Sequence, residues 1–355
     1  MSPGGETMAS TLTKTAAIPA IDPAQLLGQL TTGYEISACL YAATSLNIAD
    51  LLASGPRAID QLASATRTNS DRLYRVLRAL VSVGVFSEPQ PRTFALSPTA
   101  ELLRSDVPNS HRGFVLWTAC PFVMTVTAHM LHSVQTGQPA IEHLHGKPAF
   151  ECMSSMPEVA FAFNEGMTSI SGFLAPAVLD AYSFDGIGTL MDVAGGHGFF
   201  LCQALERYPQ MKGILLDLPS VVEGARCAIC DRRMDHRCEP VAGNFFEHIP
   251  AGADAYFMQH IMHDWDDKRC LNILGNVKQA LAGRKNGRLI VSDAVLPETS
   301  EPHPGKLLDL LMMLFPGGRE RTEKEWHALF DAAGFKITKI VPTRAPESVI
   351  EAVLR

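Results

Sequence analysis

The order of apolar and polar positions first predicts a long helix near the start of the chain. From Asp22 to Leu52, apolar residues recur at intervals of three and four, with Pro23 in the first turn. The helix is apolar on more than one face, so we expect it to be buried against a partner subunit. Residues 1–20 are Ser, Thr, Ala and Pro with little periodicity, and we expect a disordered tail there.

The next segment has the pattern of a winged helix. Residues 59–65 and 69–83 predict two helices, with Ser70 as the cap of the second, and residues 85–96 predict a β-hairpin. Such a unit can read DNA or serve as a dimerisation scaffold. Arginines line one side of the second helix, but the hairpin is poor in cations and acidic residues surround the unit. This balance favours the dimerisation scaffold.

Residues 111–185 predict a series of helices rich in Met, Phe and Trp. These side chains can form ordinary core, or they can line a pocket for a flat apolar ligand, and the sequence leaves both open. The candidate pocket residues are Trp117, Phe122, Met124, Phe163 and Met167, with Met312, Met313 and Phe315 from a later segment.

From residue 189 onward, strands alternate with helices. The predicted strands are 189–194, 213–216, 239–242, 254–258, 287–292, 336–341 and 348–354, and the predicted helices are 199–208, 221–228, 268–282 and 322–333. This alternation predicts an α/β fold with a doubly wound, mostly parallel sheet. In such a sheet, ligands bind at the carboxyl ends of the strands.

The first strand–helix–strand unit has the features of a nucleoside pocket. Its first strand runs into the glycines Gly195, Gly196 and Gly198, and its second strand ends at Asp217. Glycines let a ligand approach the backbone, and an acid about twenty residues later can accept hydrogen bonds from ribose hydroxyls. The spacing differs from G-x-G-x-x-G, which favours a nucleoside without pyrophosphate. An ordinary tight turn is the alternative.

Further polar groups follow later strands and are expected at the same edge of the sheet. Asn244, His263, Asp293 and Glu320 are the main ones. His263 is the candidate proton acceptor, because an unperturbed histidine titrates near neutral pH. Asp293 and Glu320 can hold its other ring nitrogen and stabilise the imidazolium. Asp266 is expected to cap the helix that follows.

Composition narrows the class of protein. The chain has 355 residues, 46% of them hydrophobic, which indicates a globular protein with two domains. Its net charge of −7 argues against nucleic acid as the main partner. Residues 36–49 form the longest uncharged helical stretch, which is too short to span a bilayer, and no signal segment opens the chain. We therefore expect a cytoplasmic protein without a membrane partner.

The cysteines raise the question of a metal site. All eight lack the spacing of a disulfide framework, so we expect reduced thiols. Cys227, Cys230, His236 and Cys238 have spacings that could hold zinc. Since the first two fall on a predicted helix and the others in a basic loop, we favour an interpretation without metal.

Six short motifs carry a family resemblance. They are, in order, DVAGGHG, LLDLP, GNFF, HDWDD, SDAVLP and GGRERT. With this order and these gaps, nearly the whole chain resembles the plant-caffeate-type and bacterial secondary-metabolite S-adenosylmethionine-dependent O-methyltransferases. The resemblance implies a winged-helix dimerisation domain at 21–110 and a homodimer. It also implies a Rossmann-like cofactor-binding catalytic domain at 111–355, in which 111–185 form the helical substrate-pocket segment.

The resemblance also implies roles for individual residues. The glycine loop would lie under the methionine part of S-adenosylmethionine, and Asp217 would bind its ribose. The expected cofactor contacts are Asp192, Gly195, Gly196, Gly198, Asp217, Leu218, Gly243, Asn244, Phe245 and Gln259. Asn244 stands where relatives have an aspartate that contacts adenine, and Gln259 stands where plant members have a lysine. Both contacts therefore depart from the family pattern.

At the reaction centre, the resemblance implies that His263 is the general base, flanked by Asp293 and Glu320, with Asp264 in the substrate pocket. Asp293 is often a glutamate in relatives, so its shorter arm weakens the expected contact. Phe315 replaces an asparagine that positions the acceptor in plant members.

The reaction expected from this resemblance is methylation of a hydroxyl on an aromatic or polyketide-like small molecule. His263 would take the proton as the oxygen attacks the sulfonium methyl group in line. One alternative is a relative that uses the same pocket for pericyclic, decarboxylating or hydroxylating chemistry, and another is a winged-helix DNA-binding regulator. The presence of His263, Asp293 and Glu320 favours methyl transfer. The sequence does not identify the acceptor or exclude a nitrogen or thiol acceptor.

Overall fold

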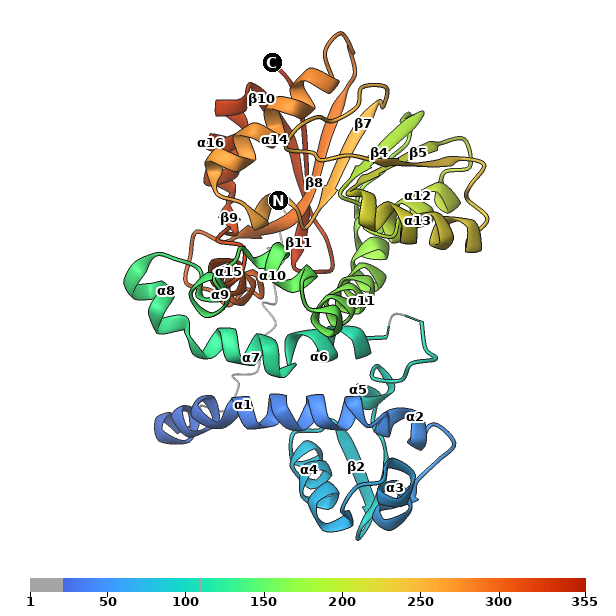
Figure 1. Cartoon of the computed structure of the whole chain (residues 1–355), viewed down its shortest axis with the longest axis vertical. Helices are drawn as coiled ribbons and strands as arrows, with labels where there is room; N and C mark the ends of the chain where they lie inside the picture. Colours follow the sequence, from blue (N-terminus) through green and yellow to red (C-terminus); the bar gives the residue numbers. More distant parts are fainter. Residues whose placement is uncertain (1–21, 109) are drawn as a thin grey trace, which may run out of the picture.

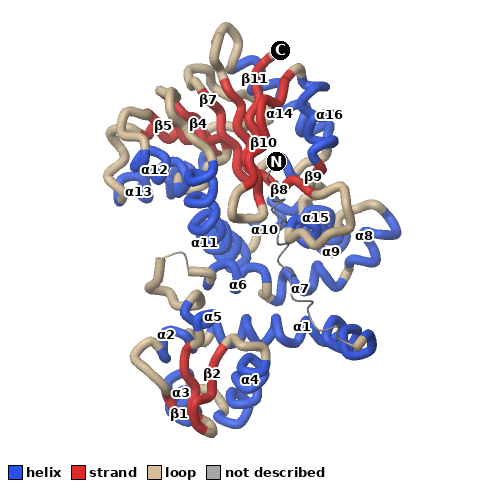
Figure 2. The backbone as a smooth tube through the Cα atoms, turned by 180° about the vertical axis from the view of Figure 1, so that it is seen from behind, coloured by secondary structure: helices blue, strands red, loops and turns tan. Residues whose placement is uncertain are grey.

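The chain folds into three layers along its longest axis. The structure is a computed structural model that describes residues 22–108 and 110–355, so the expected tail at 1–20 lies outside the described residues. A small N-terminal lobe, a central layer of helices and a C-terminal sheet domain follow one another (Figure 1). Seen from behind, the helical layer separates the small sheet from the large one (Figure 2).

The N-terminal lobe has the predicted helix–turn–helix and wing. Its sheet has three antiparallel strands in the order β1-β3-β2. The helices are α1 (Pro23–Ser45), α2 (Ile48–Leu52), α3 (Ile59–Thr66), α4 (Ser70–Ser82) and α5 (Pro98–Glu101), and the strands are β1 (Arg57–Ala58), β2 (Phe86–Gln90) and β3 (Thr93–Leu96).

Two local predictions for this lobe are wrong. The helix expected from Asp22 to Leu52 breaks before α2, because Asn47 adopts a left-handed backbone with φ 54° that a helix cannot continue through. Ser70 does not cap α4. The Asn69 side chain accepts a hydrogen bond from the Arg72 backbone N–H at 3.0 Å and does so instead.

The central layer confirms the predicted series of helices. It consists of α6 (Arg112–Thr118), α7 (Pro121–Ala128), α8 (Met130–Thr136), α9 (Ala140–His145), α10 (Ala149–Ser154) and α11 (Pro157–Ala181). The last and longest of these runs from the layer to the sheet domain (Figure 1), where Ala175 and Val178 join the core. An additional helix that the sequence analysis missed, α15 (Gly305–Leu314), packs against α7 and α8.

The sheet domain confirms the predicted doubly wound α/β architecture. Its strands run in the order β10-β11-β8-β7-β4-β5-β6, with β9 paired to β8. Strands β4 to β8 are parallel, whereas β10 and β11 are antiparallel additions at one edge. The strands are β4 (Thr189–Val193), β5 (Lys212–Asp217), β6 (Cys238–Ala242), β7 (Ala255–Gln259), β8 (Arg288–Leu296), β9 (Arg321–Thr322), β10 (Phe335–Pro342) and β11 (Glu347–Leu354).

Helices cover both faces of this sheet, and each face has its own hydrophobic core. One face is covered by α12 (Phe199–Arg207), α13 (Pro219–Asp231) and the end of α11. The other is covered by α14 (Asp267–Ala280) and α16 (Glu323–Ala333), whose Trp326 is fully buried. The strand order reverses around β4, with β5 on one side and β7 on the other. Ligands bind in α/β sheets beyond the carboxyl ends at this switch point.

The strand that carries Asp293 is longer than expected. We predicted a strand that ends at Asp293, but β8 continues to Leu296. Strand β11 pairs with it as far as Ala294, with Ser348 opposite Asp293, and β9 pairs with Val295 and Leu296. Asp293 is therefore inside the sheet and fully buried.

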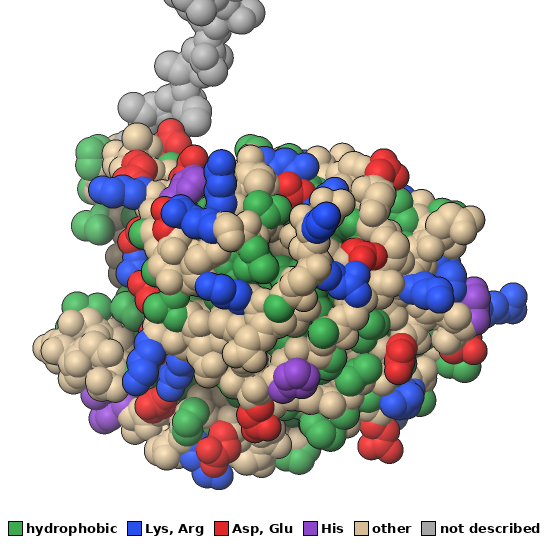
Figure 3. Space-filling model, turned by 90° about the horizontal axis from the view of Figure 1, so that it is seen from above, with side chains coloured by type: hydrophobic (Ala, Val, Ile, Leu, Met, Phe, Trp, Pro, Cys, Tyr) green, Lys and Arg blue, Asp and Glu red, His purple; other side chains and the backbone are tan. Residues whose placement is uncertain are grey.

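Among the described residues, no helix is long and apolar enough to cross a membrane. At the end of the sheet domain, positive and negative side chains are interspersed without a large patch of one sign (Figure 3).

Candidate active site

The glycine turn after β4 brings the backbone close to the sheet. Gly196 and Gly198 adopt left-handed φ angles of 58° and 77°. A Cβ atom on Gly195 would lie 2.6 Å from Asp192 Cγ, and one on Gly198 would lie 2.9 Å from Leu215 Cδ1. Larger residues would therefore clash with β4 and β5, so the turn depends on glycine for both conformation and space.

Asp217 at the end of β5 is tied to this turn. Its Oδ2 accepts a hydrogen bond from the Gly196 N–H at 2.8 Å, and its Oδ1 accepts one from the Leu218 N–H at 2.7 Å. A carboxylate oxygen can accept a second bond, so Asp217 retains acceptor capacity for a ligand. Leu218 directly precedes α13 and is half exposed beside Asp217.

Two buried polar groups at the same edge have no protein partner among the described residues. They are Asp192 Oδ2, next to the glycine turn, and Gln259 Nε2, at the end of β7. Burial, with the nearby charge of Asp217, raises the pKa of Asp192 to about 8. A buried unpaired polar group costs about 1–3 kcal/mol. A ligand that offers hydrogen bonds to these groups fits the crevice.

The residues expected to contact the adenine of the cofactor directly follow β6. A Cβ atom on Gly243 would lie 2.9 Å from Leu216 Cδ1, which again indicates close backbone packing. The Asn244 side chain is occupied within its own turn. Its Oδ1 accepts from the Phe246 N–H at 3.0 Å, and its Nδ2 donates to Glu247 Oε1 at 3.1 Å. Phe245 contacts Phe246 with ring centroids 4.7 Å apart.

His263 lies beyond β7 on a 3₁₀ turn, η1 (Met262–Asp264), and is 3% exposed. Its Nδ1 is 2.6 Å from Glu320 Oε1, which is a hydrogen bond. Asp293 Oδ1 is 3.9 Å from the same nitrogen, too far for a hydrogen bond, so Asp293 acts on His263 through its charge. With Nδ1 occupied, Nε2 is the nitrogen that can accept a proton, and Asp264 Oδ1 lies 3.7 Å from it.

The protonation state of this cluster follows from burial and charge. Burial lowers the pKa of His263, and the carboxylates of Asp293 and Asp264 oppose this effect. Burial also raises the pKa of Asp293 to about 6 and that of Asp264 to about 7. The imidazole is therefore kept neutral and able to act as a base at neutral pH.

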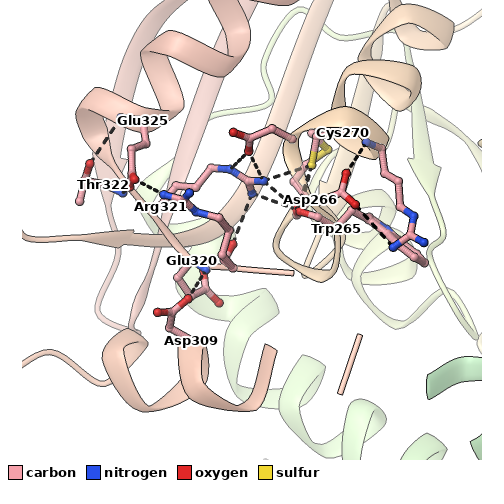
Figure 4. A network of polar contacts seen from close by, with 12 residues as sticks. Trp265, Asp266, Cys270, Asp309, Glu320, Arg321, Thr322 and Glu325 are labelled. Carbon is pink, nitrogen blue, oxygen red and sulfur yellow. Dashed lines mark hydrogen bonds and ion pairs between the residues drawn. The ribbon is translucent and has the colours of Figure 1, made fainter. Parts of the chain in front are cut away.

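A buried arginine, which the sequence analysis missed, connects the His263 turn to the Glu320 segment (Figure 4). Arg321 is 1% exposed and donates to the carbonyl oxygens of Met262 at 3.1 Å and Trp265 at 2.9 Å. Its guanidinium also donates to Asp267 Oδ1 at 2.7 Å. An arginine next to an acid in GGRERT was the available signal, but a charged residue is ordinarily assigned to the surface.

Two further polar residues orient the site. Asp309 of α15 accepts a hydrogen bond from the Glu320 backbone N–H at 2.8 Å (Figure 4) and was not predicted. Asp266 accepts from the Arg269 N–H at 2.8 Å and caps α14, as expected.

An aromatic cluster in the helical layer gathers many of the predicted pocket residues. Trp117 lies at its centre, with ring centroids 5.1 Å from Phe163, 6.3 Å from Phe315 and 6.5 Å from Phe122. Trp117 and Phe315 are buried, whereas Phe122 and Phe163 are half-buried. Met167 and Met313 pack against the cluster, while Met124 and Met312 are half-buried and are not among the residues that form it.

The cluster reaches the His263 turn through a residue that was not predicted. The Phe150 ring centroid is 6.4 Å from that of Phe163 and 5.6 Å from that of Trp265, which follows the His263 turn. A run of aromatic contacts therefore extends from the cluster to Trp265, the residue that follows the 3₁₀ turn of His263.

The cysteines considered as zinc ligands lie on different elements and differ in exposure. Cys227 and Cys230 are exposed on α13, whereas Cys238 is buried at the start of β6. Within residues 22–108 and 110–355, no group of three or more His, Cys, Asp or Glu side chains could hold a metal ion.

Comparison with known proteins gives the family. The model of the O-methyltransferase domain matches residues 128–336, and that of the O-methyltransferase dimerisation domain matches residues 28–106. The chain belongs to the O-methyltransferase family. It is an enzyme that transfers methyl groups, the family's cofactor is S-adenosylmethionine, and its N-terminal lobe is a dimerisation domain, which supports a homodimer.

Three relatives span almost the whole chain. Phenazine O-methyltransferase PhzM of Lysobacter antibioticus is 38% identical over 94% of this chain and 97% of that protein. An 8-amino-8-demethylriboflavin N,N-dimethyltransferase of Streptomyces davaonensis (strain DSM 101723 / JCM 4913 / KCC S-0913 / 768) is 34% identical over 92% of this chain and 94% of that protein. The structure of CalO1, a methyltransferase in calicheamicin biosynthesis solved with S-adenosylhomocysteine bound, has a TM-score of 0.83 and 32% identity, and covers 95% of this chain and 100% of CalO1.

Proposed function

We propose that this O-methyltransferase methylates a hydroxyl group of a flat aromatic or polyketide-like small molecule in the cytoplasm. The observation that carries the proposal is the buried His263, whose Nδ1 is held by Glu320 at 2.6 Å while Nε2 can take a proton. Aromatic side chains approach the same turn through Phe150 and Trp265. The arrangement supports removal of a proton from a ring hydroxyl.

The geometry of the crevice supports the cofactor residues that we propose. When bound, S-adenosylmethionine supplies an electrophilic methyl group on a sulfonium. Asp217 would bind its ribose, and the turn at Gly195, Gly196 and Gly198 would lie under its methionine part. The unpaired Asp192 and Gln259 side chains fit a ligand with polar groups. At the adenine end we place Leu218, Gly243, Asn244 and Phe245.

The chain's own groups prepare the acceptor for attack. His263 takes the hydroxyl proton at Nε2, and Glu320 stabilises the resulting imidazolium through Nδ1. A phenol titrates near 10 and a histidine near 6.5, so proton transfer alone is uphill by roughly 5 kcal/mol. Burial lowers the pKa of His263 further, so transfer must be coupled to methylation. Holding the reacting atoms in line can contribute about 7–11 kcal/mol.

The acceptor pocket is assigned from the aromatic cluster. A flat ring can stack on half-buried aromatic side chains and on methionines. The phenazine relative is named for a fused, flat aromatic ring, which is the kind of acceptor that such a wall fits. The proposed pocket residues are Trp117, Phe122, Met124, Phe163, Met167, Asp264, Met312, Met313 and Phe315. The homodimer would form through the domain at 21–110.

Calorimetry and mass spectrometry test the proposal. Purified protein is titrated with S-adenosylhomocysteine and then screened with phenols and aromatic amines for a mass gain of one methylene. We expect binding and methylation of a phenol. Binding followed by transfer to amines alone would contradict the hydroxyl acceptor.

The variant His263→Ala tests the base assignment. His327→Ala is the control, because His327 is a half-exposed histidine on α16 to which we assign no role in the site. His263→Ala should keep the affinity for S-adenosylhomocysteine within a few-fold. It should lose about 10²–10⁴ in kcat, the usual contribution of a general base. Equal activity in the two variants would remove the base assignment.

A further inference from the structure

A second histidine lies directly behind the base and has no role in the mechanism above. His260 follows β7 and adopts a left-handed backbone with φ 56°. Its backbone N–H donates to the Ser292 carbonyl oxygen of β8 at 3.1 Å. A left-handed residue other than glycine costs of order 1–3 kcal/mol and is retained where the surrounding structure requires it, most often at functional sites.

The His260 side chain is paired with a buried acid from a distant strand. Its Nε2 lies 2.9 Å from Oε1 of Glu347, the first residue of β11. The side chains are 17% and 4% exposed, so water provides little screening of this pair. Burial alone would lower the pKa of His260, but the hydrogen bond to Glu347 and the surrounding carboxylates outweigh burial and raise it to about 9. The pair is therefore an ion pair at neutral pH.

The two histidine rings face each other. Their centroids are 4.8 Å apart with an angle of 37° between the planes. A positive charge on His260 is therefore within contact distance of the base, and it disfavours a second positive charge on His263.

The other charged groups around His263 act in the opposite direction. Asp264 of η1, Asp293 of β8 and Glu320 before β9 all present carboxylates to its ring, at 3.7, 3.9 and 2.6 Å. Glu347, the partner of His260, also raises the pKa of His263. Negative charge stabilises the imidazolium, so these groups work against a neutral base. Arg321 contacts the backbone of the same turn and moderates the acids, as does burial. Burial lowers the pKa of His263 most, and the cation beside the ring lowers it further.

We propose that His260, paired with Glu347, is a positioning residue that holds a positive charge against His263 and so keeps the catalytic imidazole neutral and ready to accept a proton. The inference rests on the proposed role of His263 as the base. Glu347 anchors the charge, and the left-handed backbone at His260 places the ring between the acid and the base.

The pH dependence of kcat/KM tests this role. His260→Asn removes the charge, and asparagine tolerates a left-handed backbone. Without the cation, the pKa of His263 rises, so the acidic limb of the profile should move to higher pH by about one unit. His260→Lys keeps a cation, and its limb should lie close to that of the wild type. His327→Asn, an exposed histidine on α16, is the matched control and should show no shift.

The outcomes separate this inference from the proposed function. An unmoved limb in His260→Asn, with normal affinity for S-adenosylhomocysteine and an inactive His263→Ala, would overturn the role of His260 alone. An acidic limb that moves equally in His260→Asn and His260→Lys would also overturn the role of His260. The shift would then come from the changed shape of the side chain and not from its charge. Full activity in His263→Ala would instead overturn the base assignment.

A direct measurement covers the case in which His260→Asn does not fold. Histidine NMR of the full-length wild-type protein with S-adenosylhomocysteine bound, assigned with His260→Lys, reports the protonation of His260. We expect this histidine to remain protonated above neutral pH. Loss of its proton below neutral pH would refute the proposal without any variant activity.

Discussion

Replacing Arg321 by methionine tests whether one buried guanidinium holds the catalytic turn in place. The side chain is 1% exposed and donates to the carbonyl oxygens of Met262 and Trp265, which flank His263. Hydrogen bonds from a charged donor contribute about 1.5–3 kcal/mol each. The Asp267 side chain is 61% exposed, so its ion pair adds at most ~1 kcal/mol after screening by solvent. The two carbonyl bonds dominate, and we expect a loss of about 4 kcal/mol in unfolding free energy.

Two assays separate stability from catalysis in this variant. Urea unfolding of the ligand-free enzyme measures the loss, and steady-state kinetics measure kcat at a temperature where the variant is folded. Because the turn moves, kcat should fall at least about tenfold, while affinity for S-adenosylhomocysteine changes little. The control is Arg319→Met, two residues away, whose side chain is 44% exposed. If Arg321→Met lost less than about 1 kcal/mol of unfolding free energy and kept its kcat, Arg321 would not hold the catalytic turn in place.

Two further predictions concern the cofactor crevice and pH. Gly195→Ala places a Cβ atom 2.6 Å from Asp192 Cγ, so calorimetry should show at least about tenfold weaker binding of S-adenosylhomocysteine; an unchanged Kd would show that the turn can move aside. Burial raises the pKa of Asp192 to about 8, whereas an unfolded aspartate titrates near 4, so the folded protein binds a proton that the unfolded chain has released. The unfolding free energy of the ligand-free enzyme should therefore fall from about pH 5 to about pH 8 in urea titrations, and a rise across this window would contradict a buried neutral Asp192.

The large-scale architecture could be predicted because it follows from local patterns. Short apolar runs alternate with segments of helical periodicity, and this alternation predicted the doubly wound sheet. The glycine turn and Asp217 predicted the nucleoside crevice. Parallel topology also placed His263 and Glu320 at one edge, although they are far apart in sequence. In the structure the two side chains are 2.6 Å apart. Sheet topology indicated this edge for both residues, and the family resemblance implied their pairing.

Other features depend on contacts that no local pattern records. The break at Asn47 arises because the residue adopts a left-handed backbone inside a continuous apolar period. The extension of β8 past Asp293 arises from pairing of Ala294 with β11 and of Val295 and Leu296 with β9, two strands that follow later in the chain. Helix α15 was not predicted, because only Met312 and Met313 of this segment were considered, and only as pocket residues. In β8, by contrast, tertiary contact overrode the preference that the local sequence expressed.

The most informative failures all lie around the reaction centre. An arginine is ordinarily at the surface, yet Arg321 is buried. A residue other than glycine ordinarily has a right-handed or extended backbone, yet His260 is left-handed. Buried polar atoms are ordinarily paired, yet both Asp293 carboxylate oxygens lack hydrogen-bond partners in the described chain. Each departure costs free energy, which the hydrophobic cores on both faces of the sheet can offset. A folded chain retains such costs where the chemistry needs them, so the clustering of three departures around His263 is independent physical support for the site.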